Sequence, residues 1–401
     1  MDNKKNGIPK LRFPGFTGAW EQRKLGEIVE WSKGSGLSKD ALNIQGIGVP
    51  VIHYADLYKF NSVQKEVIHW TMNNIGTKIP ENNLLFPMSD VTPDGLARTS
   101  TVLQSNVKAG GDVLIAKLNK DILSTFMSYQ INRNKNQILP LVTGTTVRHI
   151  NSKSLSTLKV TVPGKNEQKY VGSILMRFDS LIALHQRKLE HLQEQKKGLL
   201  QKMFPKNGET VPEVRFPGFT DAWEQRKLGE VAEINPSSEI PDNFEYVDLE
   251  SVVGTEMIAY RRENKKTAPS RAQRLAKKGD IFYQTVRPYQ KNNYHFNLTR
   301  KDFVFSTGYA QLRPNINGDF LFVYIQLSNF VNEVLNRSTG TSYPAISPSN
   351  LIRMKVAIPT NNEQEKIGAF FKQLDSLIAL HQRKLDHLEL MKKGLLQQMF
   401  V

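Results

Sequence analysis

The sequence has no cysteine and no long apolar run, and both absences limit what the chain can be. Without cysteine among its 401 residues, it has neither a disulfide framework nor a thiolate metal site. No apolar stretch approaches the roughly 18 residues of a membrane span, and the longest obvious candidate is 320–327. The opening segment, MDNKKNGIPK, lacks the apolar core of a signal peptide. We therefore expect an intracellular, cytoplasmic protein.

The sequence also has little that commits it to chemistry. There is no G-x-x-x-x-G-K-[ST] phosphate loop and no H-E-x-x-H metal motif. The Asn-Pro-Pro-aromatic or Asp-Pro-Pro-aromatic tetrapeptide of amino-methyltransferases is missing, and NPSS (235–238) is its nearest approach. A nuclease carboxylate pair among the 38 acidic residues stays open. We assign no catalytic residue and no metal ligand.

Positive charge is what the chain has in excess. It carries 54 Lys and Arg against 38 Asp and Glu, a formal net charge of +16, and its pI is near 9.7. Such a balance favours a polyanionic partner, although solvated lysine-rich faces give many proteins the same balance. A hydrophobic content of 39% with 9% aromatic residues is typical of a globular protein, and the length suggests two or three domains.

Two long segments occur twice. LRFPGFTGAWEQRKLGEIVE (11–30) returns as VRFPGFTDAWEQRKLGEVAE (214–233), and the 39 residues 166–204 return as 362–400 with DSLIALHQRKL unchanged. Between the repeats lie two blocks with different sequences. The KNG near the N-terminus (5–7) matches the KNG that follows the first long repeat. The N-terminus therefore looks like the continuation of the C-terminus, which predicts a closed, pseudo-two-fold organisation.

The 39-residue repeats predict long helices. Each follows a proline and begins Asn-Glu, which is typical of a helix start. In 166–204, apolar residues recur at alternating steps of four and three from Val171 to Met203, and both repeats place a lysine in this stripe, Lys196 and Lys392. This 4-3 alternation indicates coiled-coil helices of roughly 58 Å. Closure favours antiparallel pairing within one chain, and an intermolecular coiled coil is the alternative.

The two blocks contain short β-type runs broken by Gly, Pro and Asn, as in mixed α/β domains. Weak matches such as TGTT (143–146) with TGTS (339–342) suggest one fold with two different surfaces. We therefore predict an α+β protein, with two similar mixed α/β domains joined by two long antiparallel coiled-coil helices. The expected boundaries are 1–30 (repeated frame segment), 31–165 (first domain), 166–204 (helix), 205–233 (linker and frame segment), 234–361 (second domain) and 362–401 (helix).

The polar segments of the blocks have the composition of DNA-binding surfaces. Arg can bond to guanine and Asn or Gln to adenine, while Lys and Arg bind phosphates. For each residue alone, an ordinary surface loop is the alternative. The candidate DNA-binding residues are Ser89, Arg98, Thr99, Arg133, Lys135, Arg148, Arg261, Arg262, Lys265, Gln284, Arg287, Tyr289, Gln290, Lys291, Asn292, Asn293 and Tyr343.

The shorter repeat has an apolar and a polar part. Its aromatic residues can pack the segment against its own domain, but packing alone does not explain why EQRK recurs unchanged. Recent duplication or the docking of two copies of one partner would explain it. The candidate docking residues are Trp20, Arg23, Trp223 and Arg226.

Two variable blocks alternating with two near-identical helices, with the signatures NEQ-x-x-[VI]-G and DSLIALHQRKL, resemble the specificity subunit of type I restriction–modification enzymes. The resemblance covers essentially the whole chain. It implies a non-catalytic DNA-binding subunit whose blocks each recognise one half of a bipartite target while the helices fix the gap.

The resemblance also implies partners and cofactors. Two modification subunits and the restriction subunits would join this chain, and S-adenosylmethionine, ATP and magnesium would bind to those partners. The alternatives are a self-contained DNA methyltransferase or nuclease and a coiled-coil scaffold protein.

Overall fold

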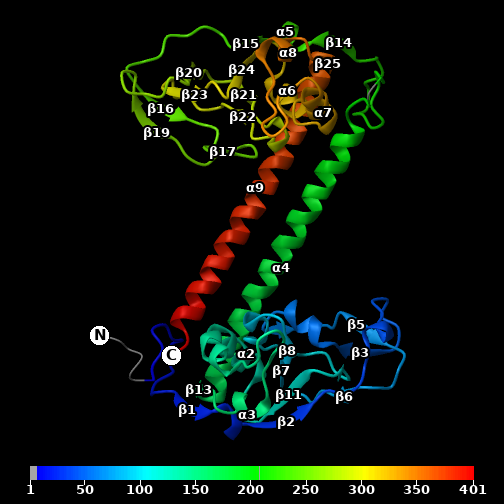
Figure 1. The fold of residues 1–401 in the computed structure, drawn as a ribbon, viewed down its shortest axis with the longest axis vertical. Coiled ribbons are helices and arrows are strands. Elements are labelled where there is room, and N and C mark those ends of the chain that lie inside the picture. The colour runs from blue at the N-terminus through cyan, green and yellow to red at the C-terminus, as the bar shows by residue number, and fades with distance from the viewer. Residues whose placement is uncertain (1–6, 207) are drawn as a thin grey trace. The chain divides into compact units, whose positions relative to one another are not determined.

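The chain folds into two compact units. In the computed structural model, which describes residues 7–206 and 208–401, unit 1 comprises Met1–Gln186 with Arg383–Val401 (Figure 1). Unit 2 comprises Arg187–Gln382. Each unit combines a mixed α/β domain with segments of two long helices, so both units draw on sequence from both halves of the chain.

The long helices are α4 (Lys165–Lys202) and α9 (Asn361–Gln398) (Figure 1). Proline follows α4 at position 205 and cannot continue the helix. Each helix has a glycine in its second turn at a point of close approach. A Cβ on Gly172 would lie 3.2 Å from Thr125 Oγ1, and one on Gly368 would lie 2.8 Å from the backbone nitrogen of Phe320. The glycine of the repeated signature therefore lets each helix pack directly against its domain.

Within each unit the segments of α4 and α9 pair antiparallel, as predicted. In unit 1, Lys392 of α9 forms an ion pair with Asp179 of α4, and the end of α9 packs with the start of α4. In unit 2, the equivalent Lys196 of α4 forms an ion pair with Asp375 of α9. The lysine that interrupts each apolar stripe thus binds a carboxylate of the facing helix.

The described residues of unit 1 form two main sheets and three short helices. One sheet has the order β2-β11-β7 and the other β5-β3-β10-β6, with β3 and β10 parallel. The strands are β2 (Val29–Lys33), β3 (Val49–Ile52), β5 (His69–Thr71), β6 (Thr77–Lys78), β7 (Asn83–Pro87), β10 (Lys108–Ala109) and β11 (Val113–Leu118). The helices are α1 (Pro93–Leu96), α2 (Ser124–Arg133) and α3 (Ser152–Leu155). Shorter strand pairs are β4 (Val63–Gln64) with β9 (Thr101–Val102), and β8 (Ser89–Asp90) with β12 (Arg148–His149).

Unit 2 repeats this topology. Its sheets have the orders β15-β24-β21-β22 and β19-β16-β23-β20, with β16 and β23 parallel. The strands are β15 (Ala232–Ile234), β16 (Asn243–Val247), β19 (Arg261–Asn264), β20 (Ala272–Leu275), β21 (Ile281–Gln284), β22 (Tyr294–His295), β23 (Phe303–Ser306) and β24 (Tyr309–Pro314), and the small hairpin β17 (Val252–Val253) and β18 (Glu256–Met257) lies apart. Taken in chain order, seven strands of each unit occupy corresponding places, so the two dissimilar blocks have one fold.

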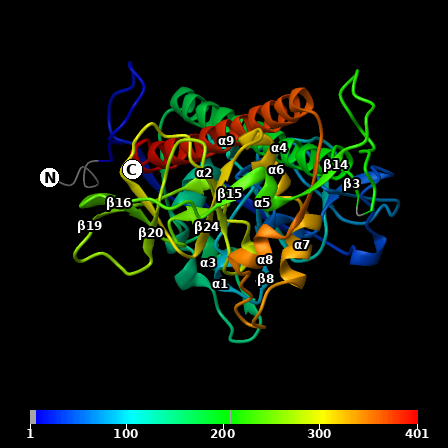
Figure 2. The same ribbon diagram turned by 90° about the horizontal axis from the view of Figure 1, so that it is seen from above.

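The sheet β15-β24-β21-β22 forms the middle layer of unit 2. Figures 1 and 2 place the other sheet on one side of it and the helices on the other. Alternate residues of β21 account for this, because Ile281 and Tyr283 belong to the core shared with the helices and Phe282 to the core between the sheets. The helices are α5 (Leu228–Val231), α6 (Gly318–Tyr324), α7 (Ser328–Asn336) and α8 (Pro348–Ile352).

The repeated segment EQRK forms an edge strand in each unit. β1 (Glu21–Lys24) pairs antiparallel with β13 (Lys159–Val162), the strand that leads into α4. β14 (Glu224–Lys227) pairs in the same register with β25 (Lys355–Ile358), which leads into α9. The polar repeat therefore has a structural role that its sequence alone did not reveal.

Two buried ion pairs fasten the same segment to the first turn of the helices. Arg12 donates to both carboxylate oxygens of Glu167 at 2.7 and 2.8 Å, and Arg215 does the same to Glu363. Both glutamates are buried, at 2% and 0% exposure. The glutamate of the NEQ signature therefore binds the frame segment. The following glutamine, Gln168 in α4, bonds to backbone groups of the α/β domain of unit 1 and to the chain before the helix.

The predicted closure of the chain is present within unit 1. The backbone N–H of Leu11 donates to Gln398 O at 2.9 Å, and the Trp20 ring meets the Phe400 ring edge-on. Unit 2 has the equivalent contacts inside its continuous linker. There Val214 N–H donates to Lys202 O at 2.9 Å, and Trp223 packs against Phe204. The last residues of the chain therefore contact its first described residues in the same way as the end of α4 contacts the linker that follows it.

Candidate nucleic-acid interface

Each unit has a pair of facing loops built in the same way. In unit 1 the loop pair is 88–92 with 143–149, and in unit 2 it is 285–291 with 339–345. Backbone bonds join Thr143 and His149 reciprocally in the first, and Thr339 and Ala345 in the second. The loops of a pair are joined by the N–H of residue 150 to Met88 O and of residue 346 to Thr285 O, each at 3.0 Å. The TGT matches of the sequence therefore mark equivalent hairpins.

Glycine sets the turn in both hairpins. Gly144 has φ of +98° and Gly340 has φ of +89°, a region that side chains with a Cβ rarely adopt. Three residues further on, Val147 and Tyr343 occupy the same place, and they are 46% and 64% exposed. The common backbone thus presents an aliphatic side chain in unit 1 and an aromatic one in unit 2.

The facing loops differ in charge at one equivalent position. Asp90 pairs with Arg148 in the strand pair β8–β12, and the N–H of Arg287 donates to Pro344 O at 2.7 Å. Asp90 and Arg287 are therefore equivalent. The Asp90 carboxylate accepts the N–H of Thr92 at 3.0 Å. One loop pair therefore has an anionic acceptor where the other has a cationic donor.

The loop 285–291 of unit 2 is held in shape by amides that the sequence suggested for DNA contact. Gln284 accepts the N–H of Asn292 at 3.2 Å, and its own N–H donates to Asn293 Oδ1 at 2.8 Å. Gln284 Nε2 also donates to Gln290 Oε1 at 2.8 Å, and Asn292 Oδ1 accepts the N–H of Gly254 at 2.8 Å. Gln284 and Asn293 are buried, at 3% and 1% exposure. Gln284 and Asn293 thus satisfy the loop backbone and do not project from it, whereas Gln290 is exposed.

Arg287 stands out among the remaining side chains of this loop. Its backbone is left-handed (φ 53°, ψ 55°), which costs a residue with a Cβ about 1–2 kcal/mol. Its guanidinium carbon lies 4.1 Å from the centre of the Tyr343 ring, and it has no ion pair within the described residues. Tyr289, in the same loop, is 49% exposed. Arg287 and Tyr343 thus form a cationic and aromatic pair with no carboxylate partner in the described part of the chain, and Tyr289 is exposed in the same loop.

Several candidates of unit 1 have structural partners instead. Arg98 donates to Tyr58 O at 2.6 Å and to Phe60 O at 2.8 Å, and burial lowers its pKa. Thr99 is 1% exposed and donates to a backbone carbonyl of β7. Arg133 donates to Val401 O at 3.0 Å, so it holds the end of the chain. These side chains stabilise unit 1.

Other candidates lie at the surface with weaker or no partners. Lys135 forms an ion pair with Asp94 at 3.2 Å, and Arg148 donates to Gly144 O at 3.1 Å. Ser89 Oγ lies 3.0 Å from His149 Nδ1. In unit 2, Arg261 is bound between Asp248 and Glu263, whereas Arg262 and Lys265 are exposed on or beside β19. The structure therefore brings only part of the candidate set together at the loop pairs.

The aromatic docking candidates are core residues. Trp20 and Trp223 are 4% and 2% exposed, so their rings are not accessible to a partner. Arg23 is bound to Glu21 at 2.7 Å, and Arg226 lies 3.8 Å from Glu230. Only the two arginines of this set present a polar side chain at the surface.

Sequence reasoning missed Asp90, Val91 and Val147 as exposed or polar members of the loop pair in unit 1. Val91 is 72% exposed beside Asp90. The weak TGT match could have revealed Val147, because it aligns Val147 with Tyr343, which the sequence did suggest. Aligning the preceding loops required the hydrogen bonds, since those sequences share no residues.

Two searches for other kinds of site found none in the described part of the chain. Among residues 7–206 and 208–401, no three His, Cys, Asp or Glu side chains group as metal ligands would. Within the same residues, no helix combines the length and the apolar content needed to cross a membrane.

Comparison with known proteins identifies the family. The model of the type I restriction modification DNA specificity domain matches residues 18–194 and 220–390. The MjaVIII type I restriction enzyme specificity subunit of Methanocaldococcus jannaschii is 22% identical over 403 residues, which is 94% of this chain and 91% of that protein. The HindI specificity subunit of Haemophilus influenzae is 25% identical over 189 residues, 45% of this chain and 41% of that protein.

A solved structure has the same fold. The type I restriction–modification S subunit from M. genitalium superimposes with a TM-score of 0.66 at 16% identity, over 98% of this chain and 99% of that one. The two matched domains correspond to the two recognition domains with their long helices. Because the family model covers most of its length, the chain belongs to the family of type I restriction–modification DNA specificity subunits.

Proposed function

We propose that the two loop pairs bind the two halves of an asymmetric, bipartite DNA target, each from the major groove. Specificity subunits are the non-catalytic DNA-recognition components of type I complexes, and this chain has two recognition domains. The observation that carries the proposal is the pair of equivalent loops with different chemistry. One fold used twice with Asp90 in one place and Arg287 in the other favours two different half-sites.

The loop pair of unit 2 fits a guanine. An arginine can donate two hydrogen bonds to O6 and N7 of guanine, and no carboxylate competes for Arg287 within the described residues. The Tyr343 ring supports the guanidinium plane at 4.1 Å, which reduces the freedom lost on binding. Tyr289 adds an exposed ring beside it.

The loop pair of unit 1 fits a different base step. Val91 and Val147 are exposed apolar side chains, which suit the methyl group of thymine. Asp90 can accept a hydrogen bond from the amino group of cytosine. Arg148 adds positive charge close to both loops.

The long helices set the number of base pairs between the half-sites in this proposal. Both are continuous over 38 residues and contribute to both units. The test inserts seven residues after Gln186 and seven after Gln382, because a heptad preserves the apolar stripe. Seven residues add about 10 Å of helix, or about three base pairs at 3.4 Å each. Methylome sequencing should then find the gap longer by about three; an unchanged gap refutes the role of the helices.

Two modification subunits are the proposed partners of the helices, and restriction subunits join that core. The DSLIAL repeat leaves the same two leucines exposed in each unit, Leu181 and Leu184 at 43% and 40%, and their equivalents Leu377 and Leu380 at 46% and 39%. Exposed apolar side chains that recur in both repeats fit two copies of one partner. The proposed complex is cytoplasmic, with S-adenosylmethionine, ATP and magnesium bound to its partner subunits.

Partner docking is tested by substitution of both leucine pairs with glutamate and measurement of the complex mass after co-purification. We expect the modification subunits to be lost. Leu390→Glu is the matched control, since Leu390 is 67% exposed on α9 but its equivalent in α4 is Glu194. Arg23→Glu with Arg226→Glu tests the frame strands separately. A complex of normal mass in the leucine variants would refute docking at this surface.

The whole proposal is tested by methylome sequencing of cells with and without this chain. An asymmetric motif with a fixed gap, present only with the chain, is the expected result. A symmetric motif, or modification independent of the chain, would contradict it.

A further inference from the structure

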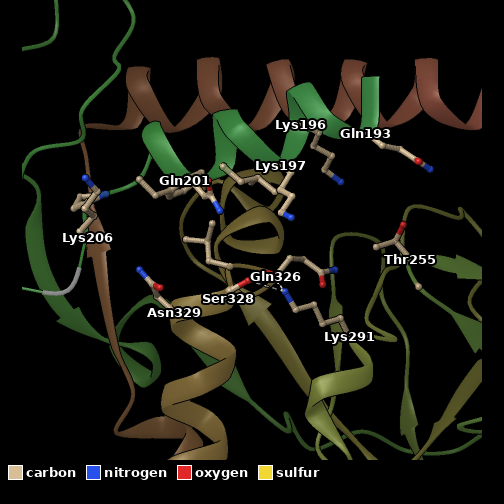
Figure 3. Close-up of a pocket in the computed structure, with 15 residues that line it drawn as sticks. Gln193, Lys196, Lys197, Gln201, Lys206, Thr255, Lys291, Gln326, Ser328 and Asn329 are labelled. Carbon is tan, nitrogen blue, oxygen red and sulfur yellow. Dashed lines mark hydrogen bonds between the residues drawn. The ribbon is translucent and has the colours of Figure 1, made fainter. Parts of the chain in front are cut away.

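Unit 2 contains a cavity of about 750 Å³ between α4 and the recognition domain (Figure 3). One wall is a single face of α4 and the chain that follows it. The other wall consists of residues 254–255, Lys291 and 326–329, the last of which lead into α7. A cavity of this size can hold a phosphate group with an adjoining sugar. We name it the α4–α7 cavity.

The lining of the α4–α7 cavity is strongly basic. It includes four lysines, Lys196, Lys197, Lys206 and Lys291, and no acidic side chain. Lys196 is bound to Asp375, and Lys206 lies 3.6 Å from Glu213. Lys197 and Lys291 have no carboxylate within 4 Å in the described part of the chain. Two ammonium groups thus face the cavity without a counter-charge.

Lys291 is held in place by neutral acceptors. Its Nζ donates to Gln326 O at 2.8 Å, and its backbone is left-handed with φ of 56°. Burial, with a further contribution from the charge of Lys196, lowers the pKa of Lys291. An anion in the cavity would oppose both effects, because it would stabilise the charged form of the lysine.

Further hydrogen-bond donors face the same space. α7 begins at Ser328, and its N-cap, Leu327, offers no side-chain acceptor to the first N–H groups. Ammonium and backbone N–H groups can only donate, so they suit a ligand with several acceptor atoms, as phosphate has. Leu200 and Leu327 add an apolar part to the lining.

Unit 1 shows that this charge is not a general property of the repeated helices. The same face of the other helix lines a groove there, with Lys392 and Lys393 in place of Lys196 and Lys197. Asp179 pairs with Lys392 there as Asp375 pairs with Lys196 in unit 2, but the groove of unit 1 also includes a second carboxylate, Glu389. At the position of Glu389, the α4–α7 cavity has the neutral Gln193. The repeat is therefore balanced in charge in unit 1 and cationic in unit 2.

We propose that the α4–α7 cavity binds one backbone phosphate of the DNA whose bases contact the loop pair of unit 2. The proposal rests on the function proposed above. Lys291 closes the same loop that carries Arg287, so the phosphate is bound next to the bases. The apolar part of the lining contacts the deoxyribose. Lys197 and Lys291 share the phosphate and fix the register of the loop without selecting a sequence.

The test measures DNA affinity against salt for the full chain with its modification subunits. Binding of one phosphate contributes about 0.9 to the slope of log affinity against log salt. Lys197→Gln and Lys291→Gln should each lower the slope by up to about 0.9, and the double variant should lower it no further, because both lysines bind one phosphate. At about 0.1 M salt, the affinity should fall roughly eightfold for target and non-target duplexes alike. Lys197→Arg should restore the slope.

Matched controls separate this site from general charge effects. Lys188→Gln removes an exposed lysine from α4, and Lys393→Gln removes the equivalent of Lys197 in unit 1; both should leave the slope unchanged. Equal thermal stability of the variants excludes misfolding.

Three results would overturn the proposal. The first is a salt slope in the double variant equal to that of the unaltered chain. The second is a loss of affinity that is confined to target DNA. The third is binding of ATP or pyrophosphate in the cavity while the lysine variants keep the salt slope of the unaltered chain. Failure of the proposed function is distinct, because then the unaltered chain itself would not prefer target DNA.

Discussion

Replacement of Arg287 by glycine separates base recognition from folding. Arg287 has left-handed backbone angles, which glycine adopts without strain. The substitution therefore removes the guanidinium from the Tyr343 ring and relieves about 1–2 kcal/mol of backbone strain. Glycine also gains freedom in the unfolded chain, which costs about 0.5–1 kcal/mol. Loss of the contact with the Tyr343 ring costs about 0.5–1 kcal/mol more, so the gain and the two costs nearly cancel and we expect a melting temperature close to that of the unaltered chain.

The loss in recognition should be much larger. A bidentate arginine–guanine contact contributes about 1–3 kcal/mol of discrimination, which corresponds to roughly 5- to 150-fold in relative affinity. The contact between the Arg287 guanidinium and the Tyr343 ring contributes about 0.5–1 kcal/mol more, because it holds the guanidinium in place. We expect Tyr343→Phe to retain the discrimination, since the ring and not the hydroxyl supports the arginine, and Tyr343→Leu to lower it.

The assay is competition between the target duplex and duplexes altered at one base pair, followed by fluorescence anisotropy. The unaltered complex should discriminate at one guanine of the half-site bound by unit 2, and Arg287→Gly should accept any base there. Arg262→Gly is the control, because Arg262 is exposed on β19 and has no ion pair in the described chain. The reasoning is refuted if Arg287→Gly keeps full discrimination at every position, or if Arg262→Gly loses as much.

Three further outcomes follow from the described contacts. Glu363→Gln should lower stability by about 3–5 kcal/mol and the melting temperature by about 6–20 °C, because it leaves Arg215 buried without a counter-charge; calorimetry should find most of this recovered when both are replaced by apolar residues. Val147→Asn should change the sequence bound by unit 1 and leave the other half-site intact, as methylome sequencing would reveal. Hydrogen bonding from His295 lowers the pKa of Asp319, so the stabilising effect of Asp319 is fully present above the ordinary pKa of an aspartate and is lost as the pH falls through the lowered pKa. The melting-temperature difference between Asp319→Asn and the unaltered chain should therefore disappear at low pH.

The long helices and their antiparallel pairing could be predicted because a heptad stripe and a repeat are local signals. The structural role of the polar loop residues could not be predicted from the sequence. Gln284 and Asn293 look like base-contacting amides in the sequence, yet the loop backbone needs their oxygen atoms as acceptors. Trp20 resembles a docking residue because it recurs, but its recurrence reflects a shared core. Whether a recurring side chain faces inward depends on partners far along the chain.

Because residues near the two ends of the described chain are in contact, folding does not require the present order of the two units in the sequence. Leu11 binds Gln398 as Val214 binds Lys202, so the described chain has two equivalent joints, one between residues 11 and 398 and one within the linker. A rearranged gene that starts within the linker at 208 and joins the present ends through a linker of similar length would encode the same contacts. Such a permuted protein should recognise the same target, with the domain that is now second synthesised first. Exchange of recognition domains between relatives would then meet no topological barrier at either joint.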